Sequence, residues 1–178
     1  RRRQANFVSI LGFVSVLLTG GLTLVASNLM WFAIKEAAVP AVIGLTVLLS
    51  MNSRRPLIRQ FVYNDQVIDT AKVDAALAQN GNVQGFKALM VKASWLVAAT
   101  FMLSSALNFV FARWMLKSPV KSEAFNQELA RMNLISLGVI ALPTLAMLMF
   151  VLWQLFGGIK RLTGLEREEI LHAPPEKK

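Results

Sequence analysis

The sequence predicts an all-α fold, a polytopic bundle of helices that cross a lipid bilayer. Of the 178 residues, 55% are hydrophobic and only 16% are charged, whereas soluble domains average about 45–50% apolar and 25% charged residues. The mean hydropathy of +0.52 points the same way. The chain also holds four apolar runs, each about as long as a helix that spans the hydrocarbon core. We predict one membrane domain over residues 1–178, with transmembrane helices at residues 7–26, 33–51, 93–112 and 134–156.

The first run, residues 7–26, contains no charged side chain. A helix of this length rises about 30 Å, which is the thickness of the hydrocarbon core. Among its small residues are Gly20, Gly21 and Thr23, and small residues let a second helix approach closely in lipid. We therefore predict helix packing or partner contact at these three positions. Packing within the chain is favoured over an interface between two copies.

The second run, residues 33–51, carries only Lys35 and Glu36 as charged residues, both at its outer end. Ionisable residues inside a bilayer are costly and often functional, so the two are candidates for an intramembrane polar pair. Placement at the interface, in reach of water, is the favoured interpretation. Pro40 lies one turn further in and, because proline lacks a backbone donor, predicts a kink there.

Basic residues follow the second run and open a predicted cytoplasmic loop over residues 52–92. Arg54, Arg55 and Arg59 are placed to meet anionic lipid headgroups or an acidic protein partner, at about 1 kcal/mol per cation near a charged surface. Fixing the orientation of the chain is the simpler role for the same three residues.

The loop is predicted to contain an amphipathic helix. Residues 65–79 place apolar and charged side chains at helical spacing, and Asn80-Gly81 provides an end. The short basic and apolar segment at residues 85–92 is expected to lie along the lipid headgroups. A soluble regulatory module is disfavoured, because about 40 residues with so few aromatic side chains make a poor core.

The third run, residues 93–112, carries one strongly polar residue, Asn108, which could hydrogen-bond a neighbouring helix. A charged outer loop at residues 117–133 separates this run from the fourth, which contains Pro143. Residues 157–178 are polar and are predicted to form a cytoplasmic tail that moves freely in water.

The distribution of basic residues predicts the orientation. With four crossings, the N-terminal end, the loop at 52–92 and the tail at 157–178 lie on one side of the membrane. These three segments hold three, six and five basic residues, so 14 of the 19 Lys and Arg share that side. The positive-inside rule makes that side cytoplasmic.

Several classes of chemistry are disfavoured by composition and pattern. The chain has no cysteine and one histidine, His172, which removes thiolate chemistry and makes a histidine-based triad or metal cluster unsupported. None of the usual phosphate-binding, nucleophile-elbow or zinc-protease patterns is present. The net charge of +9 is explained by cytoplasmic Lys and Arg rather than by nucleic-acid binding. We expect no catalytic residue, no cofactor and no metal.

Three segments carry a resemblance to a known family. Residues 20–24 read Gly-Gly-Leu-Thr-Leu, residues 55–58 read Arg-Pro-Leu-Ile, and residues 107–114 read Leu-Asn-Phe-Val-Phe-Ala-Arg-Trp. In order and spacing, over about residues 7–160, the chain resembles the intracellular septation protein A family of bacterial inner-membrane proteins and its uncharacterised relatives. The longer middle loop, residues 61–92, departs from the family pattern and indicates a sister family.

The resemblance implies a bacterial inner-membrane protein linked to cell-envelope synthesis, cell shape or division, with two more membrane helices ahead of Arg1. With the small-residue faces, it favours a non-enzymatic scaffold or accessory subunit. The expected partners are membrane lipids, other integral membrane proteins and a second copy of the chain. The alternative is a small transporter, channel or lipid-handling protein that uses Lys35 and Glu36.

Overall fold

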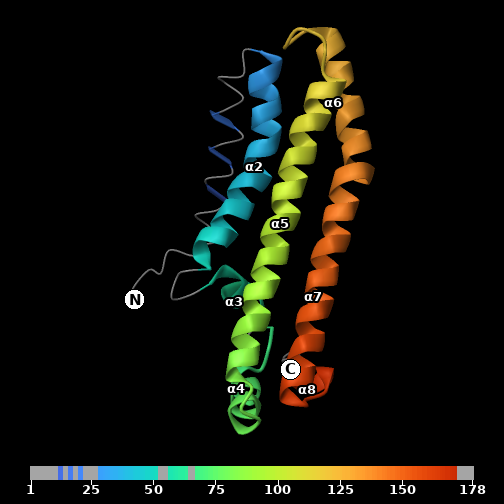
Figure 1. The fold of residues 1–178 in the computed structure, drawn as a ribbon. Coiled ribbons are helices and arrows are strands. Elements are labelled where there is room, and N and C mark those ends of the chain that lie inside the picture. The colour runs from blue at the N-terminus through green and yellow to red at the C-terminus, as the bar shows by residue number, and fades with distance from the viewer. Residues whose placement is uncertain are drawn as a thin grey trace, which may run out of the picture. The chain divides into compact units, whose positions relative to one another are not determined.

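The computed structural model describes residues 12–13, 16–17, 20–21, 28–51, 56–63 and 67–171. Within these ranges the chain is helical, with one isolated β-bridge and no strand. Three helices are long and apolar enough to cross a membrane: Leu29–Ser50, Val83–Met115 and Glu123–Thr163 (Figure 1). The all-helical fold predicted from the sequence is therefore confirmed for the described residues, and three of the four predicted spans correspond to candidate membrane helices. The predicted first helix, residues 7–26, lies mostly outside the described residues.

Helix α2, Leu29–Ser50, begins four residues before the predicted start at residue 33. The side chain of Asn28 explains the earlier start, because its Oδ1 accepts a hydrogen bond from the backbone N–H of Trp31 at 3.0 Å. A side-chain acceptor at this position satisfies a donor that the first helical turn leaves free. Trp31 thus lies in the first turn of the helix.

Helix α5, Val83–Met115, is one continuous helix of 33 residues. It contains the predicted helix at 93–112 and also the segment at 85–92 that we expected to lie separately along the headgroups. No proline interrupts residues 83–112, so the backbone hydrogen bonds continue from one segment into the other. At about 50 Å, α5 is longer than the hydrocarbon core, which is about 30 Å thick.

The last long helix is a run of 41 residues, built from α6 (Glu123–Ser136), the π-turn η1 (Leu137–Ala141) and α7 (Leu142–Thr163). It extends the predicted helix at 134–156 in both directions. At its start the Ser122 side chain caps the helix by accepting from the Phe125 N–H at 3.1 Å. Residues 123–133, assigned to the outer loop from sequence, are therefore helical.

The π-turn lies beside Pro143. The backbone N–H of Leu142 bonds to the carbonyl of Leu137, five residues back, and the Thr144 hydroxyl bonds to the carbonyl of Ile140 at 2.7 Å. A wider turn and a hydroxyl donor are two ways in which a helix keeps its carbonyls bonded beside a proline, which has no N–H to donate. The run thus continues past Pro143.

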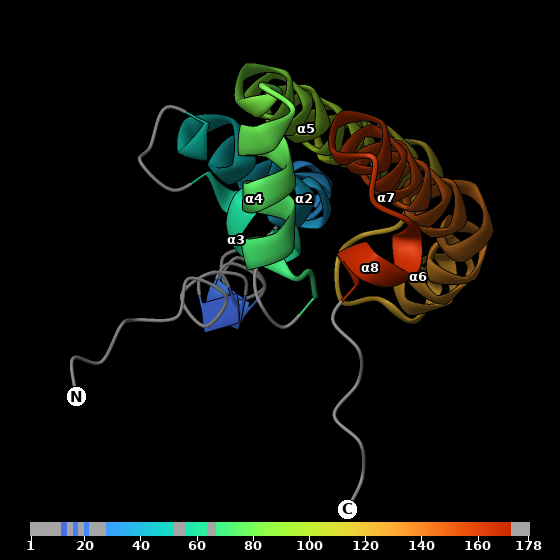
Figure 2. The same ribbon diagram turned by 90° about the horizontal axis from the view of Figure 1, so that it is seen from below.

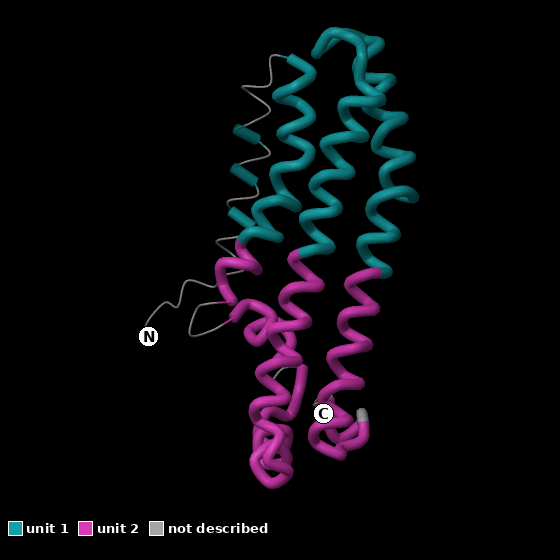
Figure 3. Tube along the Cα trace, in the orientation of Figure 1, with its two compact units in different colours: residues 1–45, 99–146 teal, residues 46–98, 147–178 magenta. Residues whose placement is uncertain are grey.

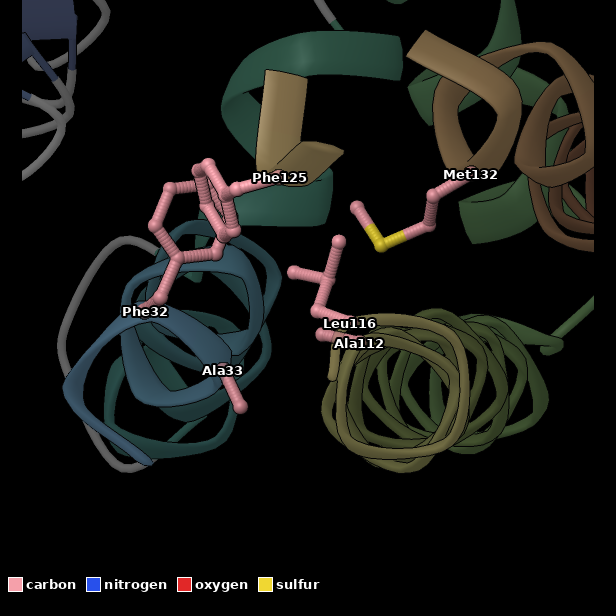
Figure 4. Packing of buried hydrophobic residues seen from close by; sticks show 6 residues of the cluster. All are labelled: Phe32, Ala33, Ala112, Leu116, Phe125 and Met132. Carbon is pink, nitrogen blue, oxygen red and sulfur yellow. The ribbon is translucent and has the colours of Figure 1, made fainter. Parts of the chain in front are cut away.

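The described chain divides into two compact units (Figure 3). Unit 1 comprises residues 1–45 and 99–146, and unit 2 comprises residues 46–98 and 147–178. Unit 1 is held by a buried cluster from α2, α5 and α6, in which the side chains of Leu116 and Met132 point into the same space (Figure 4). The rings of Phe32 and Phe125 meet edge to face there, with centroids 5.0 Å apart, a favourable aromatic geometry.

Unit 2 contains three short helices: α3 (Leu57–Val62), α4 (Thr70–Gln79) and α8 (Arg167–Ile170). Seen from below, α3 and α4 lie close together, and α8 follows directly on the end of α7 (Figure 2). Helix α4 ends where the predicted amphipathic helix at 65–79 ends but begins at Thr70, and it buries Val73 and Leu77. Its N-cap is Asp69, whose carboxylate accepts from the Lys72 N–H at 3.1 Å.

The middle connection and the C-terminal segment fold together in unit 2, and we call residues 67–82 with 159–171 the cap. Ile68 pairs with Leu171 in the isolated bridge, and Ile170 is fully buried. Two asparagines after α4 bond to the end of α7. Asn82 Nδ2 donates to the Leu162 carbonyl at 2.8 Å, and Asn80 Nδ2 donates to the Thr163 carbonyl at 2.9 Å. The predicted free tail at 157–178 is thus folded over residues 157–171.

The cap also corrects the prediction that residues 52–92 make a poor core. That prediction counted only the apolar residues of the loop itself. The C-terminal segment supplies the missing ones, since Ile159 and Ile170 are buried along with Ile68, Val73 and Leu77. A hydrophobic core assembled from two distant parts of the chain is stable where neither part alone would be.

Replacing Gly158 by alanine should destabilise unit 2, because the added methyl carbon would lie 2.6 Å from two carbons of the Leu89 side chain. Gly157→Ala is the matched control, since a methyl group there meets no atom of the described residues within 4 Å. Alanine favours a helix over glycine by about 1 kcal/mol. The thermal midpoint in detergent should therefore hold or rise for Gly157→Ala and fall for Gly158→Ala.

A third variant separates crowding from other causes. In a Leu89→Ala background the loss caused by Gly158→Ala should disappear, because the side chain that it would strike is gone. An undiminished loss in that background would show that the close approach of Leu89 to Gly158 is not the cause.

Candidate functional site

Lys35 and Glu36 form an ion pair within α2, with Lys35 Nζ 3.1 Å from Glu36 Oε1. The side chains are 13% and 25% exposed, so both are partly enclosed and both still reach the surface. Placement at the interface and an intramembrane pair both stay predictions. Neighbouring residues on a helix normally point apart, and the long lysine side chain closes that distance. Lys35 Nζ also lies 4.2 Å from the centroid of the Phe32 ring, within the range of a cation–π contact.

The pair is connected to the cluster that holds unit 1. Phe32, whose ring makes the cation–π contact with Lys35, also packs against Phe125 of α6 (Figure 4). The charge of Lys35 is therefore balanced by a carboxylate and by an aromatic face. A charge balanced in this way costs less to bury than an isolated one.

A second polar contact lies one turn along α2, beside Pro40. The hydroxyl of Ser105 in α5 donates to the carbonyl of Ala37 at 2.8 Å. Pro40 interrupts the backbone hydrogen bonds of α2 at this turn. Hydroxyl groups of neighbouring helices are a common source of replacement donors in membranes. Ser105 was missed from the sequence, where it is one of several small residues in an apolar run.

Asn108 bonds within its own helix in the part of the chain that the structure describes, and its predicted bond to a neighbouring helix stays a prediction. Its Nδ2 donates to the Ser104 carbonyl of its own helix at 2.7 Å and approaches the Ser104 hydroxyl at 3.4 Å. Glu128 of α6 holds the turn that follows α5. Its carboxylate accepts hydrogen bonds from the backbone N–H groups of Lys117 at 2.8 Å and Ser118 at 3.0 Å.

The predicted helix-packing glycines are exposed where the structure describes them. Gly20 and Gly21 have helical backbone, and a Cβ added at either meets no described atom within 4 Å. Thr23 lies outside the described residues, as do Arg54 and Arg55. A role for the two glycines in contact with a partner stays a prediction.

Arg59 is exposed on α3, and its guanidinium carbon lies 5.5 Å from the centroid of the Tyr63 ring. Tyr63 is itself buried, and its hydroxyl donates to Asp74 Oδ1 of α4 at 2.7 Å. The ring of Phe86 lies 4.8 Å from that of Tyr63. The position of Arg59 therefore depends on Tyr63, which is itself fixed by Asp74 of α4 and Phe86 of α5.

Sequence reasoning missed Tyr63, although a signal was present. It is the only tyrosine of the chain and follows Arg59 by four residues, the spacing at which two side chains share a helix face. The structure adds a basic residue, Lys87, and an apolar wall beside Arg59, which together line a pocket. The described residues contain no group of three or more His, Asp or Glu side chains that could hold a metal ion.

Comparison with known protein families, curated proteins and solved structures produced no match to this chain. The resemblance to the septation protein A family therefore stays a prediction that rests on the three segments quoted above.

Removing one member of the Lys35–Glu36 pair should cost more stability than removing both. Lys35→Met leaves the carboxylate without its partner, and Glu36→Gln leaves the ammonium, whereas the double variant leaves neither charge. We expect each single change to cost about 2 kcal/mol and the double change less than the sum of the two. Thermal unfolding in detergent measures all three, with Lys117→Met as an exposed control. Strictly additive losses would show that the pair has no coupling energy.

Proposed function

We propose that this chain is a non-enzymatic scaffold or accessory subunit of a bacterial inner membrane, acting in cell-envelope synthesis, shape or division. The observation that supports it most is the folded cap. Residues outside the apolar runs form a buried core with fixed hydrogen bonds rather than a loose loop and tail. A cap of this kind presents a constant surface that another protein can recognise.

The outer face of α4 is the part of the cap best suited to a protein partner. Ala71, Ala75 and Ala78 are exposed there at helical spacing, flanked by the charged residues Lys72 and Asp74. Small side chains let the backbone of a partner approach, and the flanking charges favour a particular orientation.

The apolar helices provide a second surface for association. Only 22%, 22% and 11% of the most apolar windows of Leu29–Ser50, Val83–Met115 and Glu123–Thr163 are buried within the chain. The remaining surface must face lipid or another membrane protein, because water would not tolerate an apolar area of that size. Other integral membrane proteins and a second copy of the chain are the partners that this surface suits.

The proposed topology has four crossings in this chain, with residues 7–26 as the first helix, and two further helices ahead of Arg1. It places the cap and the C-terminal segment in the cytoplasm. The count of basic residues supports this orientation, since 14 of the 19 Lys and Arg lie in the segments assigned to that side. The resemblance to the septation protein A family supports the inner membrane as the location.

Mild extraction of the full protein into nanodiscs, followed by mass determination, tests the proposed function. We expect defined protein partners at a fixed ratio, and we expect Ala75→Arg on the exposed face of α4 to release them while leaving the thermal midpoint unchanged. Gln127→Arg, at an exposed position on α6, is the matched control and should keep the partners.

Recovery of the protein alone in mild extraction would contradict the scaffold proposal. A lone homo-oligomer with a bound small molecule would favour the alternative, a small transporter, channel or lipid-handling protein. The ionised pair of Lys35 and Glu36 within α2 would then be the site to change first.

A further inference from the structure

A pocket of about 230 Å³ lies in unit 2, where α2 ends, α3 begins and α5 passes. Met51, Phe86 and Met90 are among the residues that form its apolar wall. Among the described residues of the lining, Arg59 and Lys87 are the two charged ones, and none is a carboxylate. This described lining therefore combines an apolar surface with two positive side chains, which suits an amphipathic anion.

The walls of the pocket are held by specific contacts. The Ser50 hydroxyl accepts from the Leu57 N–H at 3.1 Å, which fixes the first turn of α3 to the end of α2. Arg59 lies over the Tyr63 ring, and Tyr63 is fastened to Asp74 on one side and packed against Phe86 on the other. Tyr63 therefore contacts both Arg59, a basic residue of the pocket, and Phe86, part of its apolar wall. The fold thus sets the distance between these two parts of the pocket.

The position of the pocket along α5 corresponds to the boundary of the bilayer. The apolar run that fills the hydrocarbon core is residues 93–112, and α5 extends beyond it by ten residues at its N-terminal end. Phe86, Lys87 and Met90 lie in this extension. A pocket there is at the depth of headgroups and of the first methylene groups of the acyl chains.

We propose that the pocket binds one molecule of an anionic phospholipid from the surrounding leaflet. Its phosphate lies between Arg59 and Lys87, and its glycerol and upper acyl carbons lie against Phe86 and Met90. Guanidinium and ammonium groups are the usual protein partners of phosphate. The volume suits part of a lipid, because pockets that enclose a whole drug-sized ligand measure about 300–1,000 Å³. This inference is independent of the scaffold proposal.

A phospholipid matches both the basic residues and the apolar wall of the pocket, whereas a soluble anion matches only the basic residues. A free phosphate would use only the two cations and leave the apolar wall in contact with water. A lipid uses both features at once, and the bilayer supplies it at high local concentration. The two charges add to the attraction that any basic surface feels near an anionic leaflet.

The test is the retention of lipid by purified full-length protein reconstituted in a bilayer of phosphatidylcholine with phosphatidylglycerol. After transfer to detergent, native mass spectrometry counts the lipids that remain bound. We expect one phosphatidylglycerol per chain in the wild type and about fivefold weaker retention for Lys87→Gln, from the contribution of one cation near a charged surface. Lys92→Gln is the matched control, because Lys92 is exposed on the same helix and does not line the pocket.

Two further measurements separate the proposed site from its alternatives. Arg59→Gln should weaken retention by a similar factor, and the double variant Arg59→Gln/Lys87→Gln should retain phosphatidylglycerol no better than phosphatidylcholine. Glycerol 3-phosphate in solution should not displace the lipid, because it lacks the apolar part.

Three results would overturn the proposal. Equal losses for Lys87→Gln and Lys92→Gln would indicate general attraction to the membrane surface rather than a site. Equal retention of phosphatidylglycerol and phosphatidylcholine by the wild type would show that the charge is not recognised. Displacement by glycerol 3-phosphate at low concentration would assign the pocket to a soluble anion instead.

Discussion

The hydrocarbon core of a membrane offers no hydrogen-bond partner to the backbone, and this constraint shapes the described chain. Every backbone group at that depth must be bonded within the protein, so the apolar runs form helices. The same constraint explains the polar contacts beside the two prolines. Ser105 bonds a carbonyl of α2 near Pro40, and a π-turn with the Thr144 hydroxyl accompanies Pro143. In both places a side-chain hydroxyl bonds a backbone carbonyl in the turn next to the proline.

The cap follows from helices that are longer than the membrane is thick. Helix α5 and the 41-residue run both exceed the length needed to cross the hydrocarbon core. The ends that project give the middle connection and the C-terminal segment a surface to fold on. Burial of Ile68, Ile159 and Ile170 stabilises this arrangement. We propose that function is located at these ends, with a protein partner at α4 and a lipid in the pocket beside Arg59.

Hydropathy predicted the class of fold and the three described membrane helices, because an apolar run of about 20 residues is rare in proteins that fold in water. Hydropathy did not identify residues 83–92 and 123–133 as parts of those helices. The polar composition of these helix ends is also typical of loops. The cap was out of reach for a different reason. It joins residues about 100 positions apart, such as the backbones of Ile68 and Leu171, and no local pattern encodes that pairing. Of the candidate residues, Lys35, Glu36 and Arg59 were identified from charge, whereas Tyr63 and Lys87 required the fold.

The association of residues 67–82 with 159–171 is the central claim, and an engineered disulfide tests it most directly. The chain has no cysteine of its own, so the double variant Ile68→Cys/Leu171→Cys provides a single pair. Partners in an antiparallel bridge have Cα atoms about 4.5–5.5 Å apart, a separation that a disulfide can span. We predict that mild oxidation in the native membrane links the two positions nearly completely within each chain. Failure to form the link, while the protein remains folded in the membrane, would contradict the cap and the functions placed on it.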